Sequence, residues 1–231
     1  MKTIGMIGGL AWPSSAQYYE LINQNIQGML GASHSARILL YSFDFHDVDV
    51  LQHQGLWGEA ASLMIAAARI LEQGGADLLL ICSNTMHRVA DEVQESCRIP
   101  LLHIADVVAG HAHQAGIATV GLLGTKFTME EGFYKNRLAR HGLATLIPEP
   151  EDRDLLHRII YDELVRGIVT DSSRDALRKM MVSLEQKGAE GIILGCTEIM
   201  LLTKDLPARI PILDSTALHA QAAASHALST E

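Results

Sequence analysis

The feature that most constrains the fold of this chain is an internal repeat. A helix-ending Glu-Gln-Gly-Gly-Ala-Asp stretch begins at Glu72 and is followed by an apolar run and a Cys-Ser-Asn-Thr loop. A similar stretch begins at Glu185 and leads through a second apolar run to a Gly-Cys-Thr-Glu loop, which aligns Ser83 with Cys196. Both copies predict the end of a helix, a buried strand and a small polar loop. A duplicated fold would bring these two loops to equivalent places.

Two further pairs of segments repeat in the same order. Residues 3–9 resemble residues 119–125, and residues 98–102 resemble residues 209–213. Because three repeated segments keep their order along the chain, we interpret the repeat as a duplication of a whole structural unit.

The repeat also suggests where the chain divides. A length of 231 residues suits one large domain or two small ones, and the duplication favours two similar lobes. We predict a first lobe at residues 1–115 and a second at residues 116–215. The final helix, residues 216–231, is expected to pack back onto the first lobe.

Short apolar runs alternate with segments of helical period. The runs are rich in Ile, Leu and Val and bounded by small or polar residues, which is typical of strands buried on both faces. The expected strands are residues 3–7, 38–43, 78–82, 118–123 and 191–194. The expected helices are residues 14–30, 57–73, 86–96, 106–114, 129–141, 152–166, 172–186 and 216–228. We therefore predict an α/β fold of two similar lobes, each a mainly parallel sheet flanked by helices, related by a pseudo-twofold axis. Since ligands of parallel sheets bind beyond the carboxyl ends of the strands, we expect the active site in a cleft between the lobes.

Composition and charge narrow the class of partner. The formal net charge is −9 and no run of Lys or Arg occurs, which argues against a nucleic acid or an anionic membrane surface as partner. No stretch approaches the roughly 20 apolar residues that span a bilayer, and the start of the chain is unlike a signal peptide. We predict a cytoplasmic protein that binds a small molecule.

The glycines after the first strand leave a dinucleotide site as an alternative. Gly5, Gly8 and Gly9 match only part of the G-x-G-x-x-G pattern, and the second strand is not followed by a convincing ribose partner. Tight packing of the strand against its loop explains these glycines as well, and it also lets backbone amides approach an anion.

No metal site or disulfide framework is expected. His111 and His113 lie on different faces of a helix, and no carboxylate or cysteine completes a ligand set near them or near His103. The three cysteines are odd in number and lack the Cys-x-x-Cys spacing.

Cys196 is the cysteine best suited to chemistry. Gly195 gives the backbone freedom just after a buried strand, and loop amides there could lower the thiol pKa from its ordinary value of ~8.5. Cys82 lies one position earlier in its copy, so the alternation of side chains along a strand should point it away from the site. Cys97 is expected to pack as a small hydrophobe. An inert, buried Cys196 is the alternative, and the repeat favours the reactive one.

These residues resemble the aspartate/glutamate/hydantoin racemase superfamily, and the resemblance covers almost the whole chain. It is carried by residues 2–10, by Asn-Thr-Met-His at residues 84–87, by residues 123–128 and by Gly-Cys-Thr-Glu at residues 195–198. The branch that it resembles most is that of the cofactor-independent amino-acid racemases of the enterobacterial L-aspartate/glutamate-specific type. The resemblance implies two similar lobes, a catalytic residue after a strand in each, no cofactor, and a homodimer.

The resemblance also implies the site residues. The catalytic pair falls on Cys196 and Ser83, although the family usually has cysteine at the second position. The residues implied to bind substrate are Leu10, Gln52, Asn84, Thr85, Thr125, Thr128, Thr197 and Glu198. Basic residues that hold the side-chain carboxylate in other aspartate racemases fall near Val48 and Val165, and Gln52, Arg166 or Lys126 could replace them.

The expected reaction is interconversion of L- and D-aspartate or glutamate by transfer of the α-proton between two groups. Cys196 would be the thiolate base, and Ser83 would donate to the opposite face, directly or through water. Two alternatives stay open: a decarboxylase of the same superfamily that uses one cysteine, and an amino-acid-binding protein without catalysis.

Overall fold

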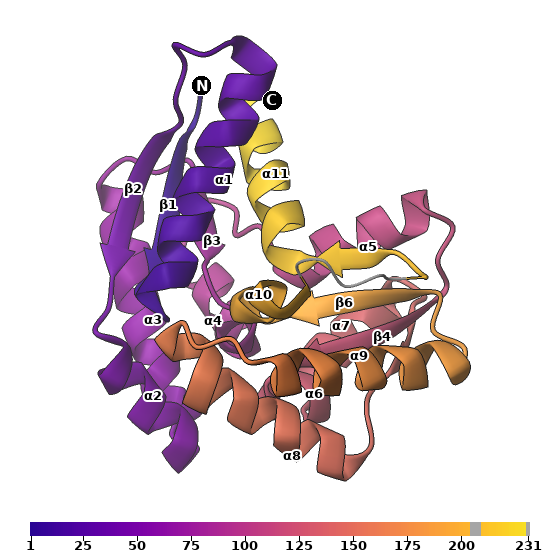
Figure 1. Ribbon diagram of the computed structural model, residues 1–231. Helices are drawn as coiled ribbons and strands as arrows, with labels where there is room; N and C mark the ends of the chain where they lie inside the picture. Colours follow the sequence, from indigo (N-terminus) through magenta and orange to yellow (C-terminus); the bar gives the residue numbers. More distant parts are fainter. Residues whose placement is uncertain (204–208, 230–231) are drawn as a thin grey trace. The chain divides into compact units, whose positions relative to one another are not determined.

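The computed structural model describes residues 1–203 and 209–229 and contains two compact units, each built on its own parallel sheet (Figure 1). The first unit comprises Met1–His103 and the chain from His219 onward, and the second comprises Ile104–Leu218. The predicted α/β class with two lobes of mainly parallel sheet is confirmed.

The first unit has the strand order β2-β1-β3, with all pairs parallel. Its elements are β1 (Thr3–Gly8), α1 (Trp12–Leu30), β2 (Arg37–Ser42), α2 (Phe45–Gln54), α3 (Trp57–Gln73), β3 (Leu78–Ile81), the 3-10 helix η1 (Thr85–Val89) and α4 (Ala90–Glu95). Alternate residues of β1 face opposite layers: Ile4 and Met6 share a cluster with residues of α1, and Ile7 shares one with residues of α3. The sheet is therefore covered by helices on both faces.

The second unit has the strand order β5-β4-β6-β7, again parallel throughout. Its elements are α5 (Ile104–Gln114), β4 (Thr119–Gly124), α6 (Lys126–Glu130), α7 (Gly132–Arg140), β5 (Ala144–Leu146), α8 (Pro150–Arg158), a π-helical turn η2 (Ile159–Glu163), the 3-10 turn η3 (Leu164–Arg166), α9 (Asp171–Gln186), β6 (Gly191–Gly195), the 3-10 turn η4 (Thr197–Ile199), α10 (Met200–Thr203) and β7 (Ile212–Asp214). The helix α11 (Ser215–Leu228) begins in this unit and continues into the first.

The units divide one helix earlier than the expected boundary at residue 115. The apolar face of α5, which includes Ile104, Val108 and Ala112, packs in the same cluster as Val120 and Leu122 of β4. Since burial of these side chains against β4 stabilises α5 there, α5 belongs to the second unit. The end of the chain returns to the first unit, where Ala220 and Ala223 share a cluster with β1 residues. Residues 230 and 231 of the expected final helix lie outside the described residues.

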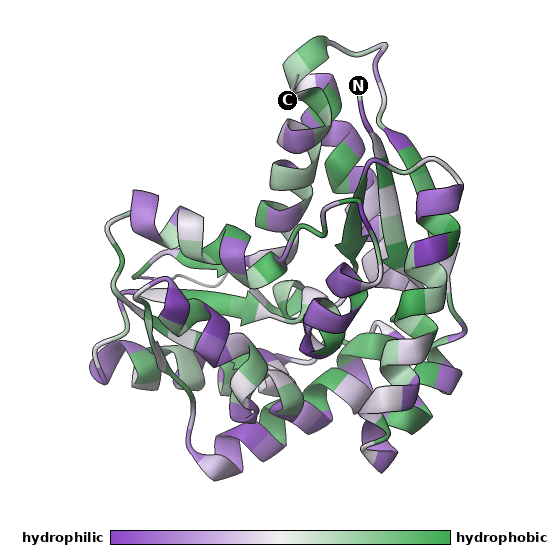
Figure 2. Ribbon diagram, turned by 180° about the vertical axis from the view of Figure 1, so that it is seen from behind, coloured by the Kyte–Doolittle hydropathy of each residue, from purple (hydrophilic) through white to green (hydrophobic). Residues whose placement is uncertain are grey.

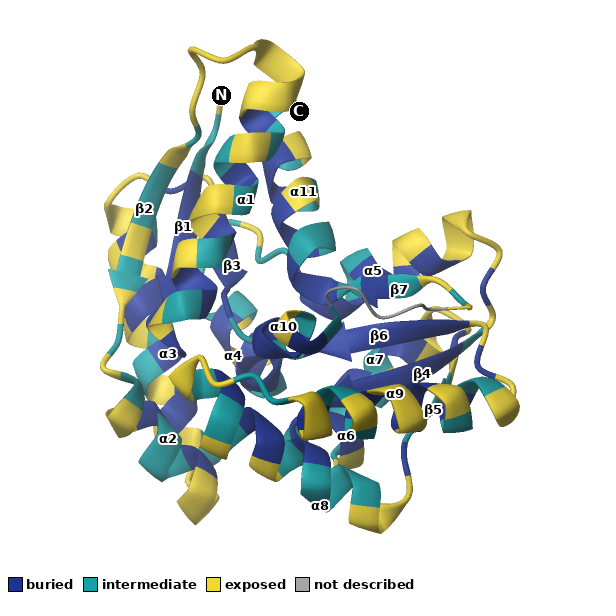
Figure 3. Ribbon diagram, viewed as in Figure 1, coloured by how far each residue is buried: buried dark blue, intermediate teal, exposed yellow. Residues whose placement is uncertain are grey.

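The strands are apolar along most of their length (Figure 2) and differ in burial. β3 and β6 are buried throughout (Figure 3): β6 lies inside its sheet, and β3, at the edge of its sheet, is flanked by the parallel bridge of Leu79 with Leu101. The expectation of burial on both faces is wrong for β2, where Arg37, Leu40 and Ser42 are exposed because the strand lies at the edge of its sheet.

Several expected elements differ in detail. The helix α2 and the short strands β5 and β7 were not expected, and the expected helices at 86–96 and 129–141 are each divided in two. A signal for α2 was present: Asp44 caps its first turn by accepting from the His46 amide at 3.1 Å, and Gly55 ends it in the left-handed conformation.

The apolar face of α3 lies in the core. Ala60, Met64, Ala67 and Leu71 are buried and pack in one cluster with the sheet of the first unit. Packing in the core therefore accounts for the apolar face of α3.

Candidate active site

Ser83 and Cys196 occupy equivalent register positions in the two sheets. The register pairs are Ile7 with Ile81 in the first sheet and Leu123 with Leu194 in the second. Counting two residues onward from these pairs aligns Gly9 with Ser83 and Thr125 with Cys196. In each unit the candidate catalytic residue therefore begins the loop at the carboxyl end of a strand that pairs with the unit's first strand, β1 or β4, and parallel sheets bind ligands at such ends.

Exposure singles out the same two side chains. Every residue from 78 to 87 is buried except Ser83, which is partly exposed. Every residue from 191 to 199 is buried except Cys196, which is also partly exposed. Each loop therefore offers one reactive side chain to a ligand.

Cys82 points away from this loop, as the alternation along the strand predicts. Its side chain is fully buried in a cluster with Ile4 and Met6, and burial raises the pKa of its thiol far above the ordinary range. Such a thiol is a packing group and not a base.

The surroundings of Cys196 favour its thiol over the thiolate. Its Sγ donates to Glu198 Oε2 at 3.0 Å, and the same oxygen accepts from Thr197 Oγ1 at 2.6 Å. Burial and then the negative charge of Glu198 raise the pKa of the Cys196 thiol well above its ordinary value. The loop amides of Glu198 and Ile199 lower that pKa, as expected from the sequence, but burial and Glu198 outweigh them.

Replacing Glu198 with glutamine is expected to lower the pKa of Cys196. The neutral amide removes the charge that destabilises the thiolate, while the other groups around the thiol stay the same. The pKa is measured from the ultraviolet absorbance of the thiolate as a function of pH, with the Cys196→Ala protein as blank so that Cys82 and Cys97 cancel. An unchanged or higher pKa in Glu198→Gln would contradict this account.

Thr125 and Thr128 line the strand ends beside Cys196. Thr125 caps α6: its Oγ1 accepts from the Thr128 amide at 3.3 Å and lies 3.2 Å from Thr128 Oγ1. Thr128 is fully buried against Gly124 and Gly195, where a Cβ on either glycine would meet it at 3.2 Å. These two glycines let Thr128 pack its Cβ and methyl group closely against the ends of β4 and β6.

The first unit provides a matching set of polar groups around Ser83. Asn84 and Thr85 are buried directly after it, and the Met86 amide contacts Ser83 Oγ at 3.4 Å. Leu10 packs its side chain in the core, so the loop at Leu10 can offer only backbone groups.

The three side chains expected to hold an acidic substrate side chain differ in their availability. Gln52 is buried and donates to Met86 Sδ at 3.0 Å, and Lys126 pairs with Asp154 at 2.6 Å. Arg166 is exposed on η3. Arg166 is therefore the candidate that needs no existing contact broken.

His87 belongs to the Ser83 loop, and no catalytic or binding role of its own was expected for it from the sequence. Its Nδ1 donates to the carbonyl oxygen of Ser83 at 2.7 Å, so its side chain bonds the backbone of the candidate donor. The signal was its spacing of four residues after Ser83, which brings the two together on one helical turn.

The described part of the chain shows neither a metal cluster nor a membrane helix. No group of three or more metal-binding side chains gathers there, and no helix in it has the length and apolarity to cross a bilayer.

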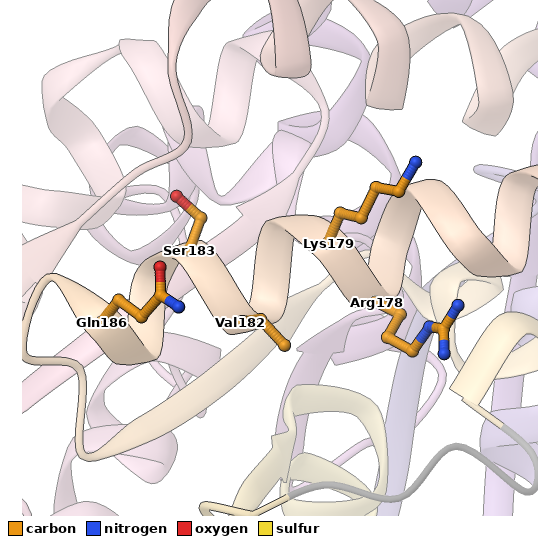
Figure 4. A pocket seen from close by; sticks show the side chains of 5 residues that line it. All are labelled: Arg178, Lys179, Val182, Ser183 and Gln186. Atoms are coloured by element: carbon orange, nitrogen blue, oxygen red, sulfur yellow. The ribbon is translucent and has the colours of Figure 1, made fainter.

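A surface hollow of about 320 Å³ lies away from these loops. Figure 4 shows that its lining comes from α9 alone. Its residues are Arg178, Lys179, Val182, Ser183 and Gln186. They follow the spacing of one helical face and include none of the candidate site residues.

Fold and site together define a class. The chain is a duplicated parallel α/β protein with a thiol loop in one lobe and a hydroxyl loop at the equivalent place in the other. The family model for Asp/Glu/hydantoin racemases matches residues 7–223, and the chain belongs to this family. It is by class an amino-acid racemase, an isomerase.

Solved structures and a curated relative match this chain along almost its whole length. It is similar to a Yersinia pestis protein whose crystal structure is assigned to the Asp/Glu racemases, with 49% identity, a TM-score of 0.93, and coverage of 99% of this chain and 100% of that one. An aspartate racemase homologue from Pyrococcus horikoshii is 33% identical, with a TM-score of 0.84 and coverage of 99% and 100%. The broad specificity amino-acid racemase RacX of Bacillus subtilis is 24% identical over 235 residues, with coverage of 96% of each chain.

Proposed function

We propose that this chain interconverts the L and D enantiomers of aspartate or glutamate without a cofactor, through Cys196 and Ser83. The observation that carries the proposal is the equivalent register position of these two residues, each the one partly exposed side chain of a buried loop. Substrate class is supported by relatives described as aspartate or Asp/Glu racemases.

The chemistry begins with the Cys196 thiol and Glu198. In the first step Glu198 takes the thiol proton along the existing 3.0 Å contact, which leaves a thiolate. The thiolate then takes the α-proton of the L-enantiomer and becomes a thiol again, while the bonding pair stays on the α-carbon. Hydroxyl donors such as Thr125 and Thr128 would stabilise the negative charge that spreads onto the α-carboxylate.

The second half of the reaction takes place at Ser83. A water bound to its hydroxyl gives a proton to the opposite face of the α-carbon, which forms the D-enantiomer and hydroxide. The proton held by Glu198 neutralises that hydroxide and restores the starting state. An alcohol holds its proton more tightly than a thiol, so the pair is asymmetric.

The test is proton NMR of L- and D-aspartate and L- and D-glutamate with the protein in deuterated water. Loss of the α-proton signal reports proton removal, and the appearance of the opposite enantiomer reports inversion. Release of carbon dioxide from a substituted malonate without inversion of an amino acid would identify a decarboxylase. Saturable binding without deuterium uptake would identify a binding protein.

Replacing Ser83 with cysteine is expected to raise the rate of deuterium uptake from the D-enantiomer by about tenfold or more, because a thiol is a better base than a hydroxyl. The equilibrium constant of racemisation is one, so kcat/KM must rise equally in both directions. Ser83→Ala is the matched control and should show the opposite effect. If Ser83→Cys gives no gain while folding normally, Ser83 is not at the donor position.

We further propose that the protein acts in the cytoplasm as a homodimer, in keeping with the resemblance to the racemases. Light scattering coupled to gel filtration measures the assembly, and a monomer mass would remove the homodimer from the proposal.

A further inference from the structure

A buried cluster of one tyrosine and three histidines lies behind the loop of Ser83. It consists of Tyr18 from α1, His87 from η1, His103 just before α5, and His219 from α11. All four belong to the first unit. Their relative exposures are 0%, 3%, 6% and 0%, which is unusual for histidine, a residue that is more often partly exposed. We call this group the histidine cluster.

The hydrogen bonds of His219 fix its tautomer. Its Nε2 lies 2.8 Å from the carbonyl oxygen of Leu102, and because a carbonyl can only accept, Nε2 carries the proton. Burial, and then the neighbouring His87, lower the pKa of His219 to about 3, so the ring is neutral and Nδ1 is an acceptor. Tyr18 therefore donates its hydroxyl proton to Nδ1 across 2.8 Å. This ties α11 to α1 and to the chain at Leu102.

The ring of His219 supports that of His87. The ring centroids of His87 and His219 are 5.7 Å apart at an angle of 65°, and those of His87 and His103 are 4.7 Å apart at 64°. Both are edge-on contacts of the kind that aromatic rings favour. His87 is thus held between two buried rings and cannot turn without displacing one of them.

His87 in turn holds Ser83. Its Nδ1 donates to the Ser83 carbonyl oxygen at 2.7 Å, so this nitrogen bonds the backbone of Ser83 and not its hydroxyl. The Ser83 hydroxyl instead lies 3.4 Å from the Met86 amide, on the first turn of the same loop. The imidazole therefore fixes the backbone from which the hydroxyl projects.

We propose that His87 is a positioning residue for Ser83, and that His219 on the final helix keeps His87 in place. This inference rests on the proposed function, because it assigns the cluster a role in proton delivery at Ser83. Ser83 is partly exposed, so water could satisfy its carbonyl without a buried imidazole. Burying a polar ring carries a free-energy cost of desolvation that an apolar side chain of similar size would not carry. Here the buried rings fix the orientation of the Ser83 loop.

The second lobe lacks this device. At the position that the repeat aligns with His87, the chain has Met200. There the loop side chain Cys196 donates directly to Glu198, and burial and then the charge of Glu198 raise the pKa of the thiol. The two loops therefore differ in what their contacts do. In the loop of Cys196 the contact with Glu198 changes the acidity of the thiol, and in the loop of Ser83 the contact with His87 fixes the direction of the hydroxyl.

The experiment combines His87→Leu, His87→Asn and Ser83→Ala, singly and as the double variant of His87→Leu with Ser83→Ala. Leucine removes the donor, whereas the asparagine amide nitrogen can take the place of Nδ1. In deuterated water the thiol of Cys196 can return deuterium to the face from which it took the proton. Deuterium uptake by the L-enantiomer with retention therefore reports Cys196 alone, and inversion reports Ser83 as well.

We expect His87→Leu to reduce inversion roughly ten- to hundredfold, the cost of misplacing a catalytic group, with uptake at the L-enantiomer largely kept. His87→Asn should recover part of the loss, and His87→Leu should have no further effect once Ser83 is alanine. Equal loss of inversion and of L-enantiomer uptake, or the same loss in the Ser83→Ala background, would overturn the positioning role.

A readout that needs no activity separates this inference from the proposed function. The NMR chemical shifts of the Ser83 carbonyl carbon and the Asn84 amide should change in His87→Leu and return towards the original values in His87→Asn, since both report the bond to Nδ1. Unchanged shifts would overturn the inference even if the protein is a racemase. Changed shifts in a protein that inverts no amino acid would support the hold on Ser83 and contradict the proposed function instead.

Discussion

Replacing Cys196 with alanine is expected to abolish exchange of the α-proton from either enantiomer, with a loss of about a thousandfold or more. The thiol is the partly exposed side chain of its loop and lies 3.0 Å from the carboxylate that can accept its proton. Alanine leaves no group there that can take a proton from carbon, and Ser83 alone is too weak a base. Solvent deuterium uptake measured by proton NMR checks the loss.

The matched control for this experiment is Cys97→Ala. Cys97 is half-buried like Cys196, but its Sγ contacts Ser96 Oγ at 3.3 Å and lies on a helix end remote from both loops in sequence. Its removal should leave exchange within a factor of about two. Retained exchange in a folded Cys196→Ala protein would contradict the assignment of the base, and equal losses in both variants would point to damage of the fold.

The second large effect is expected on stability, from replacing Gly9 with alanine. Gly9 has φ of +74°, and a Cβ there would overlap the carbonyl oxygen and the amide nitrogen of Phe43. Neither backbone group can move freely, because the Phe43 amide donates to the Gly8 carbonyl at 3.0 Å and continues the pairing of β1 with β2. We expect Gly9→Ala to lower the free energy of unfolding by more than about 4 kcal/mol.

Gly55→Ala provides the control for backbone strain alone. Gly55 has φ of +71°, nearly the same as Gly9, but an added Cβ would meet no heavy atom within 4 Å. The left-handed conformation costs a residue with a Cβ about 1–2 kcal/mol, so the difference between the variants isolates the overlap with Phe43. Urea unfolding measures both. Equal losses of unfolding free energy in the two variants would show that the backbone at Phe43 shifts to accommodate a Cβ at Gly9.

Much of the site could be predicted from the sequence because it depends on local pattern. The alternation of side chains along β3 separates Cys82, in the core, from Ser83, in the loop. The repeat aligns Ser83 with Cys196, and the strand registers give the same alignment independently. The role of these two residues in catalysis stays a prediction until exchange is measured.

What the sequence by itself determined is the duplicated parallel α/β plan and the two loops, since both follow from periodicity and turn residues over short stretches. Only the tertiary structure decided that α5 groups with the second unit and that burial and Glu198 raise the pKa of the Cys196 thiol. It also brought His219 and Tyr18 together, two residues 201 positions apart in the chain. The burial of an atom and the electrostatic potential at it depend on neighbours from many elements, and a local sequence pattern does not contain those neighbours.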